Sequence, residues 1–243
     1  MVGTYRGIPV SVAIGDNQAS FLGSVQHPSE TVLINFGTGS QITLLHDSGT
    51  PFSPTPEIEV RPYLSGKSLI SGSALCGGRA YALLESFFRA YSVACGLPDT
   101  EQYEVMNRLA AQAIKEDTHL SVQTTFCGIR SDHTVRGAVG GIGEDNLTPG
   151  ALIAGTLYGM AEELYAMFRK MPSERIRAVV VSGNAVRKNP ALRQVLTRVF
   201  GMQIAIPVPM EEAAYGAALF AYKTVEPYAD LQKFYTYTME TEE

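Results

Sequence analysis

The sequence has no tryptophan and only three cysteines, Cys76, Cys95 and Cys127, among its 243 residues. The cysteines are widely spaced and form no C-x-x-C pair, so we expect neither a disulfide framework nor a structural zinc site. The four histidines lack an H-x-x-x-H spacing and give no metal signal. This cysteine usage is typical of a reducing compartment and predicts a cytoplasmic location.

Two further absences limit the partners. No block of basic residues occurs and the net charge is −5, so nucleic acid is not an expected partner. No run approaches the roughly 18 apolar residues that span a membrane, and the N-terminal apolar run is too short for a signal peptide. The chain is 45% hydrophobic, which is enough for the core of one large or two small domains.

The pattern of apolar residues predicts alternating strands and helices. Strands are expected at 8–14, at 31–45 as a hairpin, and at 57–64, 67–73, 176–183 and 202–208. Helices are expected at 16–25, 74–91, 101–117, 148–170, 189–201 and 211–222. The glycine-rich segment 124–146 is expected to be irregular, with a short strand at 135–139, and residues 223–243 to form a frayed tail. Residues 1–222 are therefore predicted to form one α/β domain, a mixed sheet with helices on both faces.

Capping residues support two of the helix predictions, and an apolar stripe supports a third. Thr148 with Pro149, and Asn189 with Pro190, are favourable helix starts, and Gly201 suits a helix end. The helix at 74–91 carries apolar residues at helical spacing. These residues are Ala80, Leu83, Leu84, Phe87, Phe88 and Tyr91.

The stretch "AIGDNQ" places Asp16 between an apolar run and a helix. Aspartate is a good N-cap and stabilises a helix by roughly 1 kcal/mol in that role. A carboxylate at the carboxyl end of a strand also lies where open α/β sheets bind ligands. There it could accept a proton from a substrate hydroxyl. The residues alone leave both interpretations open.

Three glycine-rich stretches allow a similar choice. Gly37-Thr38-Gly39-Ser40 is a hairpin turn or a place where backbone N–H groups converge on an anion. Gly77-Gly78 permits close helix packing or close approach of a ligand. The segment "VVVSGNAVRKNP" is an ordinary strand-to-helix loop or a site beside a helix N-terminus.

The order and spacing of these motifs are more specific than any one of them. They resemble the second half of the FGGY carbohydrate kinases, which are actin-like ATPases with a ribonuclease H-like fold. The resemblance runs from about residue 7 to residue 222. Within the family, the sequence is most similar to the sedoheptulokinase branch. It is carried by "VAIGDNQAS", "RPYLSGKSLISGSALCGGRAYALLESF", "EDTHLSVQTTFCGIRSD", "DNLTPGALIAGTLYGMAEEL" and "VSGNAVRKNPALRQVLTRVFGMQIAIPVPMEEAAYGAAL".

The resemblance implies a role for each matching residue. Asp16 would be the general base for the attacking sugar hydroxyl and would reach Mg²⁺ through water, while Asn17 would contact a sugar hydroxyl. The residues implied to surround ATP are Gly37, Thr38 and Gly39 at the β- and γ-phosphates, Gly77 and Gly78 near the phosphates or ribose, and Gly183, Asn184, Ala185 and Lys188 around the adenine. Asn184 departs from the family pattern, in which a second glycine is common; its side chain would either narrow the pocket or contact the base.

The resemblance also implies a missing N-terminal half, which should carry an Asp-x-Gly-Thr phosphate turn. The single stretch of that form, 47–50, is crowded by prolines and is interpreted as a loop. The chain is therefore expected to be the nucleotide-side domain of an ATP- and Mg²⁺-dependent kinase acting on sedoheptulose or a related ketose or polyol. The expected partners are the sugar, the N-terminal half and a second copy in a homodimer. The alternative is a stand-alone nucleotide- or sugar-binding regulatory module without catalysis.

Overall fold

A seven-stranded mixed sheet forms the centre of the computed structural model, which describes residues 1–47 and 51–239. Its order is β11-β10-β9-β3-β4-β6-β5. The β9–β3 and β10–β9 pairs are parallel and the others are antiparallel. The strands are β3 Thr31–Phe36, β4 Ser40–His46, β5 Ile58–Pro62, β6 Ser68–Ala74, β9 Ala178–Ser182, β10 Ile204–Pro207 and β11 Tyr237–Met239.

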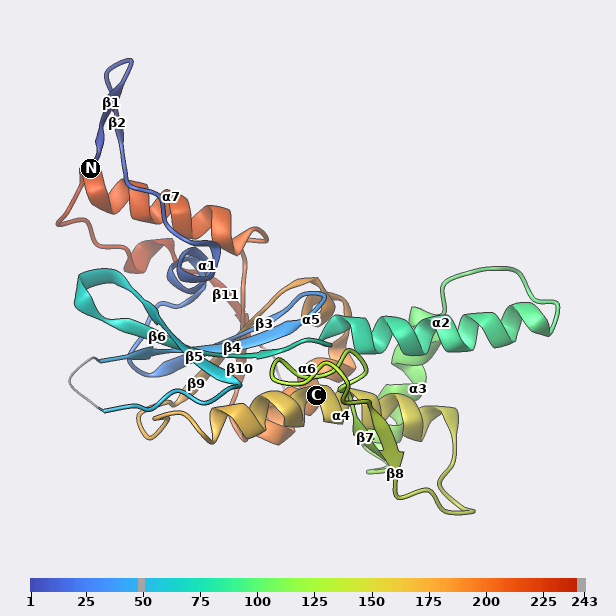
Figure 1. Ribbon diagram of the computed structural model, residues 1–243. Helices are drawn as coiled ribbons and strands as arrows, with labels where there is room; N and C mark the ends of the chain where they lie inside the picture. The colour runs from blue at the N-terminus through green and yellow to red at the C-terminus, as the bar shows by residue number, and fades with distance from the viewer. Residues whose placement is uncertain (48–50, 240–243) are drawn as a thin grey trace.

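Helices cover both faces of this sheet (Figure 1). On one face lie α1, Asp16–Ser24, and α7, Glu212–Val225. On the other lie α4, Pro149–Phe168, and α6, Pro190–Phe200, with α3, Tyr103–Lys115, packed against both. The remaining elements are α2 Gly78–Ala94, α5 Asn184–Lys188, the 3₁₀ turns Leu64–Gly66 and Gln232–Phe234, and two small hairpins, β1 Gly3–Tyr5 with β2 Ile8–Val10 and β7 Ser121–Gln123 with β8 Ala138–Gly140. The expectation of a mixed sheet between helices is confirmed.

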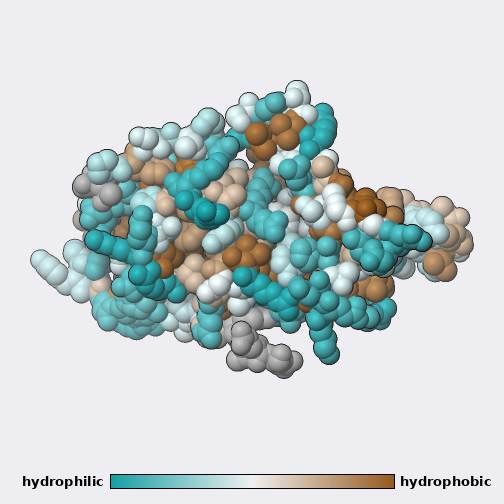
Figure 2. Space-filling view, turned by 90° about the horizontal axis from the view of Figure 1, so that it is seen from below, coloured by the Kyte–Doolittle hydropathy of each residue, from teal (hydrophilic) through white to brown (hydrophobic). Residues whose placement is uncertain are grey.

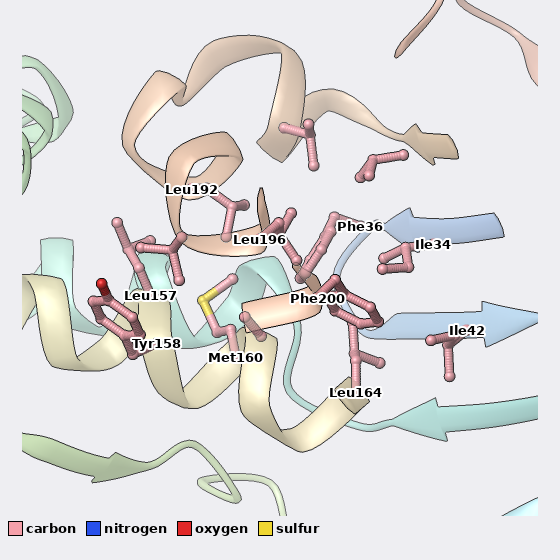
Figure 3. Packing of buried hydrophobic residues seen from close by; sticks show 14 of the residues in the cluster. Ile34, Phe36, Ile42, Leu157, Tyr158, Met160, Leu164, Leu192, Leu196 and Phe200 are labelled. Carbon is pink, nitrogen blue, oxygen red and sulfur yellow. The ribbon is translucent and has the colours of Figure 1, made fainter. Parts of the chain in front are cut away.

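The larger core lies between the sheet and α4 with α6. Ile34, Phe36 and Ile42 point from β3 and β4 toward the helices, and all three are fully buried. Figure 3 shows them opposite Leu164 and Phe200 of the two helices. Burying a side chain of this size contributes about 1.5–3 kcal/mol, so this layer holds the β3–β4 hairpin rigidly in place.

The predicted caps are present. The Thr148 hydroxyl accepts a hydrogen bond from the Ala151 N–H at 3.1 Å, and Asn189 Oδ1 accepts one from the Leu192 N–H at 3.1 Å. Gly201 ends α6 in the left-handed region with φ of 63°, which glycine adopts without steric cost. Local sequence signals therefore fix the starts of α4 and α6 and the end of α6.

The first predicted strand, residues 8–14, is wrong. The structure forms only a short strand at Ile8–Val10, which pairs with β1 alone and is exposed. In Figure 1 this hairpin stands away from the sheet beside α7. A short apolar run cannot distinguish a sheet strand from a segment outside the sheet, and Asp16 therefore does not follow a strand of the main sheet.

Helix α2 buries less of its apolar stripe than the sequence suggests. Ala80 is buried, but Leu83, Phe87 and Tyr91 are 46%, 61% and 69% exposed. The helix projects from the body of the molecule in Figure 1, and hydrophobic residues appear on the arm at the right of Figure 2. Helical spacing identifies an apolar face but does not say what covers it.

The expectation of a frayed tail after residue 222 is also wrong for the part that the structure describes. Helix α7 continues to Val225, and Tyr237–Met239 pairs with β10 as an edge strand. The Tyr237 hydroxyl donates to the Ser24 carbonyl at 2.7 Å, which ties the tail to α1. Of the loop expected at 47–50, residues 48–50 lie outside the described residues. None of the described helices is long and apolar enough to cross a membrane.

Helices α1 and α7 cross with almost no space between their backbones. A methyl group on Gly216 would lie 1.8 Å from the Ala19 carbonyl oxygen, and one on Gly23 would lie 2.3 Å from the Glu212 carbonyl oxygen. Side chains at these positions would separate the helices. The glycines of α1 and α7 therefore allow this close crossing.

We predict that Gly216→Ala destabilises the domain. Alanine favours a helix by about 1 kcal/mol over glycine, but overpacking at this crossing should outweigh that gain and give a net loss of ~1–3 kcal/mol. Urea unfolding measures the change. Ala218→Val, on the exposed side of the same helix, is the control and should cost under ~1 kcal/mol. Equal or greater stability of Gly216→Ala would contradict the close crossing.

Candidate functional site

Two pockets meet at the carboxyl end of β3, where Asn35 contributes to both. The first has a volume of about 360 Å³ and lies between the start of α1 and the sheet. It is lined by Asp16, Asn17, Ser20, Leu33, Asn35, Gln41, Thr43 and Arg61. Nearly all these side chains are polar, which suits a hydroxyl-rich ligand.

The second pocket, of about 650 Å³, lies between the β3–β4 turn, the start of α2 and the start of α5. Its lining residues are Asn35, Phe36, Gly37, Thr38, Gly78, Arg79, Ala82, Gly183, Asn184, Ala185, Met210, Glu211 and Glu212. Six of the nine residues implied to bind ATP are therefore brought together in one pocket of ligand size.

Asp16 is the first residue of α1, and its carboxylate is exposed at the first pocket. Its Oδ1 accepts a hydrogen bond from the Asn17 N–H at 2.7 Å. The N-cap position belongs to Gly15, which makes no side-chain cap hydrogen bond. The N-cap interpretation of Asp16 is thus wrong, and its carboxylate faces a polar pocket.

Asn17 is held by a relay of side-chain amides. Gln41 Nε2 donates to the Ser73 hydroxyl at 3.1 Å, and Asn17 Nδ2 donates to Gln41 Oε1. This chain orients the Asn17 amide and leaves its Oδ1 buried without a hydrogen-bond partner among the described residues. A buried acceptor without a partner costs about 1–3 kcal/mol, so a ligand hydroxyl that donates to Asn17 Oδ1 would satisfy it.

The glycine turn at 37–39 is supported from behind by the start of α2. The N–H groups of Gly78 and Arg79 donate to the carbonyls of Gly37 and Thr38 at 3.0 and 3.1 Å. Methyl groups at Gly77 and Gly78 would lie 2.5 and 2.8 Å from the backbone of the turn. Gly77 and Gly78 therefore bring the start of α2 against the turn. Gly37, Thr38 and Gly78 line the pocket, whereas Gly39 and Gly77 do not.

On the opposite wall, Gly183 has φ of 100°, and a methyl there would lie 2.3 Å from the Phe36 carbonyl oxygen. This contact brings Asn184 and Ala185 beside the turn. Ala185 supplies an apolar surface and the Asn184 side chain is exposed at the pocket. Lys188 is exposed at the end of α5 and does not line either pocket.

A partly buried ion pair supports the same wall. Arg187 Nη2 lies 2.8 Å from Glu212 Oε1 and donates to the Pro209 carbonyl at 2.8 Å. Glu212 is the first residue of α7. The pair therefore connects α5, which carries the residues implied to contact adenine, to the helix that packs on α1.

Arg61 adds a positive charge to the lining of the first pocket. Arg61 and Arg130 both bond to Glu59 Oε1, Arg130 at 2.8 Å. Burial alone would raise the pKa of Glu59, but the hydrogen bonds and charges of the two arginines outweigh it and hold the pKa below its usual value. Glu59 stays ionised and keeps Arg61 at the pocket.

Sequence reasoning missed several lining residues, including Asn35, Gln41, Arg61, Arg79 and Glu212. Asn35 and Gln41 are polar positions in the two strands of the hairpin. The Asn35 amide donates to the Ser182 hydroxyl at 3.0 Å. Polar residues inside the hairpin strands were the available signal. Nothing local marks Arg61, Arg79 or Glu212, because their positions depend on tertiary packing.

The donor set fits a nucleotide better than a protein-held metal ion. In the described part of the chain, no three His, Cys, Asp or Glu side chains form a metal cluster. The close glycine contacts at 77, 78 and 183 bring the starts of α2 and α5 to the β3–β4 turn. The pocket between these segments is where a phosphate chain could lie. A magnesium ion at such a site is usually held by phosphates, water and one or two carboxylates, and Asp16 is the carboxylate present at the first pocket.

Comparison with known proteins supports this view. Residues 32–225 match the model of the C-terminal domain of the FGGY family of carbohydrate kinases. Human sedoheptulokinase is 29% identical over 227 residues, covering 88% of this chain and 46% of that protein. Glycerol kinase 1 of Lactiplantibacillus plantarum is 28% identical, covering 93% and 44%. The chain thus spans about half the length of the curated relatives it matches.

Solved structures agree on the fold. Xylulose kinase from Rhodospirillum rubrum superposes with a TM-score of 0.81 at 18% identity, over 99% of this chain and 48% of that one. Plasmodium falciparum glycerol kinase with ADP gives 0.71 at 17% identity, over 93% and 45%. These likenesses show the actin-like ATPase fold. The chain therefore belongs to the FGGY family of carbohydrate kinases and carries the C-terminal domain of that family.

Proposed function

We propose that this chain is the nucleotide-side domain of an ATP-dependent carbohydrate kinase that transfers the γ-phosphate to a sugar hydroxyl. The observation that carries the proposal is the junction of two pockets at Asn35. One pocket is lined by the exposed Asp16 carboxylate and by Asn17, whose buried amide oxygen has no partner among the described residues, and the other is lined by the glycine turn. An acceptor hydroxyl and a phosphate chain placed in them would meet at the end of β3.

In this mechanism Asp16 accepts the proton of the attacking hydroxyl, and Asn17 Oδ1 orients the sugar by accepting a hydrogen bond from it. Phosphoryl transfer depends mainly on positioning and charge stabilisation. The N–H group of Thr38, which lines the second pocket, makes no backbone hydrogen bond within the described residues, so it is free to bind a phosphate oxygen. Asp16 is the residue that would help to hold a magnesium ion, through water, and the ion would supply charge neutralisation.

The sugar is proposed to be sedoheptulose or a related ketose or polyol. The human and mouse relatives are sedoheptulokinases, at 29% and 27% identity. The polar lining of the first pocket supports a polyhydroxylated substrate without distinguishing among sugars. The remaining sugar contacts would come from an N-terminal half, since the curated relatives are about twice as long.

Three earlier expectations stay predictions. The cytoplasmic location rests on cysteine usage alone. The homodimer is supported by the exposed apolar residues of α2, Leu83, Phe87 and Tyr91, which a second copy could cover. Lys188 as an adenine contact would require its exposed side chain to turn toward the pocket.

The alternative is a regulatory module that binds nucleotide or sugar without catalysis. Asp16 separates the two functions. In the full-length protein that carries this domain, we expect Asp16→Asn to lower turnover by ~10²–10⁴-fold, because an amide cannot accept the proton. Melting temperature should be unchanged, since Asp16 caps no helix. Sugar-dependent ATP consumption measures turnover.

Asp99→Asn, at an exposed ion pair remote from both pockets, is the matched control and should keep normal activity. An Asp16→Asn protein with near-normal turnover would refute the general-base role. If the unmodified full-length protein consumes no ATP with any ketose or polyol, that result would favour the binding module without catalysis.

A second prediction concerns substrate binding. Asn17→Ala should raise the KM for sugar by about tenfold, equivalent to one hydrogen bond of about 1.4 kcal/mol, while the KM for ATP stays unchanged. Initial-rate kinetics with each substrate varied in turn measures both values. A change in the KM for ATP alone would place Asn17 on the wrong side of the site.

The third prediction addresses the chain alone. It should bind a non-hydrolysable ATP analogue in roughly the millimolar range, about −4 kcal/mol, because only one wall of the site is present. Gly78→Val should abolish this binding, since its side chain would meet the Gly37 carbonyl. Ala90→Val, exposed further along α2, should bind normally. Calorimetry that finds sub-micromolar affinity would contradict the half-site interpretation.

A further inference from the structure

Two of the three cysteines lie together beside the glycine turn. Cys76 immediately precedes Gly77 and Gly78 and is 2% exposed. Its thiol lies beside Cys127, whose thiol and backbone N–H both affect the pKa of Cys76. Cys127 lies in the irregular segment between β7 and β8 and packs against the same core. Residues far apart in the sequence thus form a thiol pair.

The two thiols differ in their surroundings. Burial raises the pKa of the Cys76 thiol to about 12, and the neighbouring Cys127 and the Glu163 carboxylate add to the rise. Cys127 is only partly buried, and Arg79 Nη1 lies 4.0 Å from its Sγ. Positive charge beside a solvent-accessible sulfur is typical of oxidation-sensitive cysteines. Cys127 is therefore the sulfur that meets an oxidant, and Cys76 is the neighbour that reacts second.

We propose that Cys76 and Cys127 are an oxidisable pair that forms an intramolecular disulfide on reaction with a hydroperoxide. In the first step the Cys127 sulfur attacks the peroxide oxygen, the O–O bond breaks, and Cys127 sulfenic acid and water or an alcohol result. In the second step the Cys76 sulfur attacks the sulfenic sulfur, its proton joins the departing hydroxide, and water leaves. Overall two thiols are oxidised and one peroxide is reduced.

The pair is placed to affect the nucleotide pocket, an effect that rests on the proposed function. A disulfide requires the two sulfurs to approach to about 2.05 Å, so the backbone at Cys76 or Cys127 must shift. Gly77 follows Cys76 and contacts the backbone of Gly39 and Ser40 without space for a methyl group. Arg79, which lines the pocket, contacts Cys127. Oxidation should therefore disturb the glycine turn and weaken nucleotide binding.

Cys95 provides an internal control. It is exposed at the C-terminal end of α2, about 25 Å of helix away from Gly78 at 1.5 Å rise per residue. A disulfide selective for Cys76 and Cys127 would therefore reflect their juxtaposition and not general thiol reactivity.

The experiment treats the reduced chain with one equivalent of hydrogen peroxide and then alkylates free thiols. Intact and peptide mass spectrometry should find a Cys76–Cys127 cross-link, a loss of two hydrogens and one alkylated cysteine, Cys95. Cys95→Ser should form the same cross-link, whereas Cys127→Ser and the fold-conserving Cys76→Ala should not. Irreversible oxidation of Cys127 without a cross-link, or intermolecular Cys95 disulfides alone, would overturn the proposal.

Calorimetry with a non-hydrolysable ATP analogue then tests the coupling. The oxidised chain should bind about tenfold more weakly than the reduced chain, within the usual range of coupling between sites, and dithiothreitol should restore binding. Equal affinities of the two forms would overturn the coupling while the cross-link stands. No binding to the reduced chain would instead contradict the nucleotide site itself, and the coupling with it.

Discussion

The whole site depends on close contact between backbones at the β3–β4 turn. Gly37 and Gly39 lie against Gly77 and Gly78, and Gly183 lies against the carbonyl of Phe36. A single methyl group at Gly77, Gly78 or Gly183 would approach another backbone to 2.8 Å or less. Because these glycines carry no side chains, the starts of α2 and α5 can both reach the turn. That convergence makes a pocket from three segments that are far apart in the sequence.

Polar side chains extend this arrangement across the sheet. The Asn35 amide donates to Ser182 on β9, and Gln41 on β4 connects Ser73 on β6 to Asn17 on α1. Polar groups inside a sheet cost free energy unless they are paired. Here each pairing joins neighbouring elements around the junction of the two pockets. Asn17 Oδ1 is left buried without a hydrogen-bond partner among the described residues, and Asn17 lines the pocket where a substrate hydroxyl is proposed to bind.

The sequence predicted what local chemistry controls. Most strand and helix positions and the caps at Thr148 and Asn189 followed from residue type and spacing. The gathering of Gly37, Gly78 and Gly183 around one pocket was implied by the resemblance to the FGGY kinases. Prediction from the sequence failed where packing against other elements decides the structure. The run at 8–14 forms no strand of the main sheet, and the stripe on α2 that includes Phe87 remains largely exposed. Apolar pattern measures how much surface a segment can bury, and tertiary structure decides whether anything covers it.

The state of Asp16 is the last constraint on how the domain works. Its carboxylate is exposed and accepts a hydrogen bond only from the Asn17 N–H within the described residues. Water competes with any substrate hydroxyl at such a group, and charge interactions are weak in its presence. Enzymes strengthen these interactions by excluding water from the closed site. Because the Asp16 carboxylate is exposed, the proton transfer proposed for it would require further protein to cover the pocket and exclude water, which agrees with relatives about twice the length of this chain.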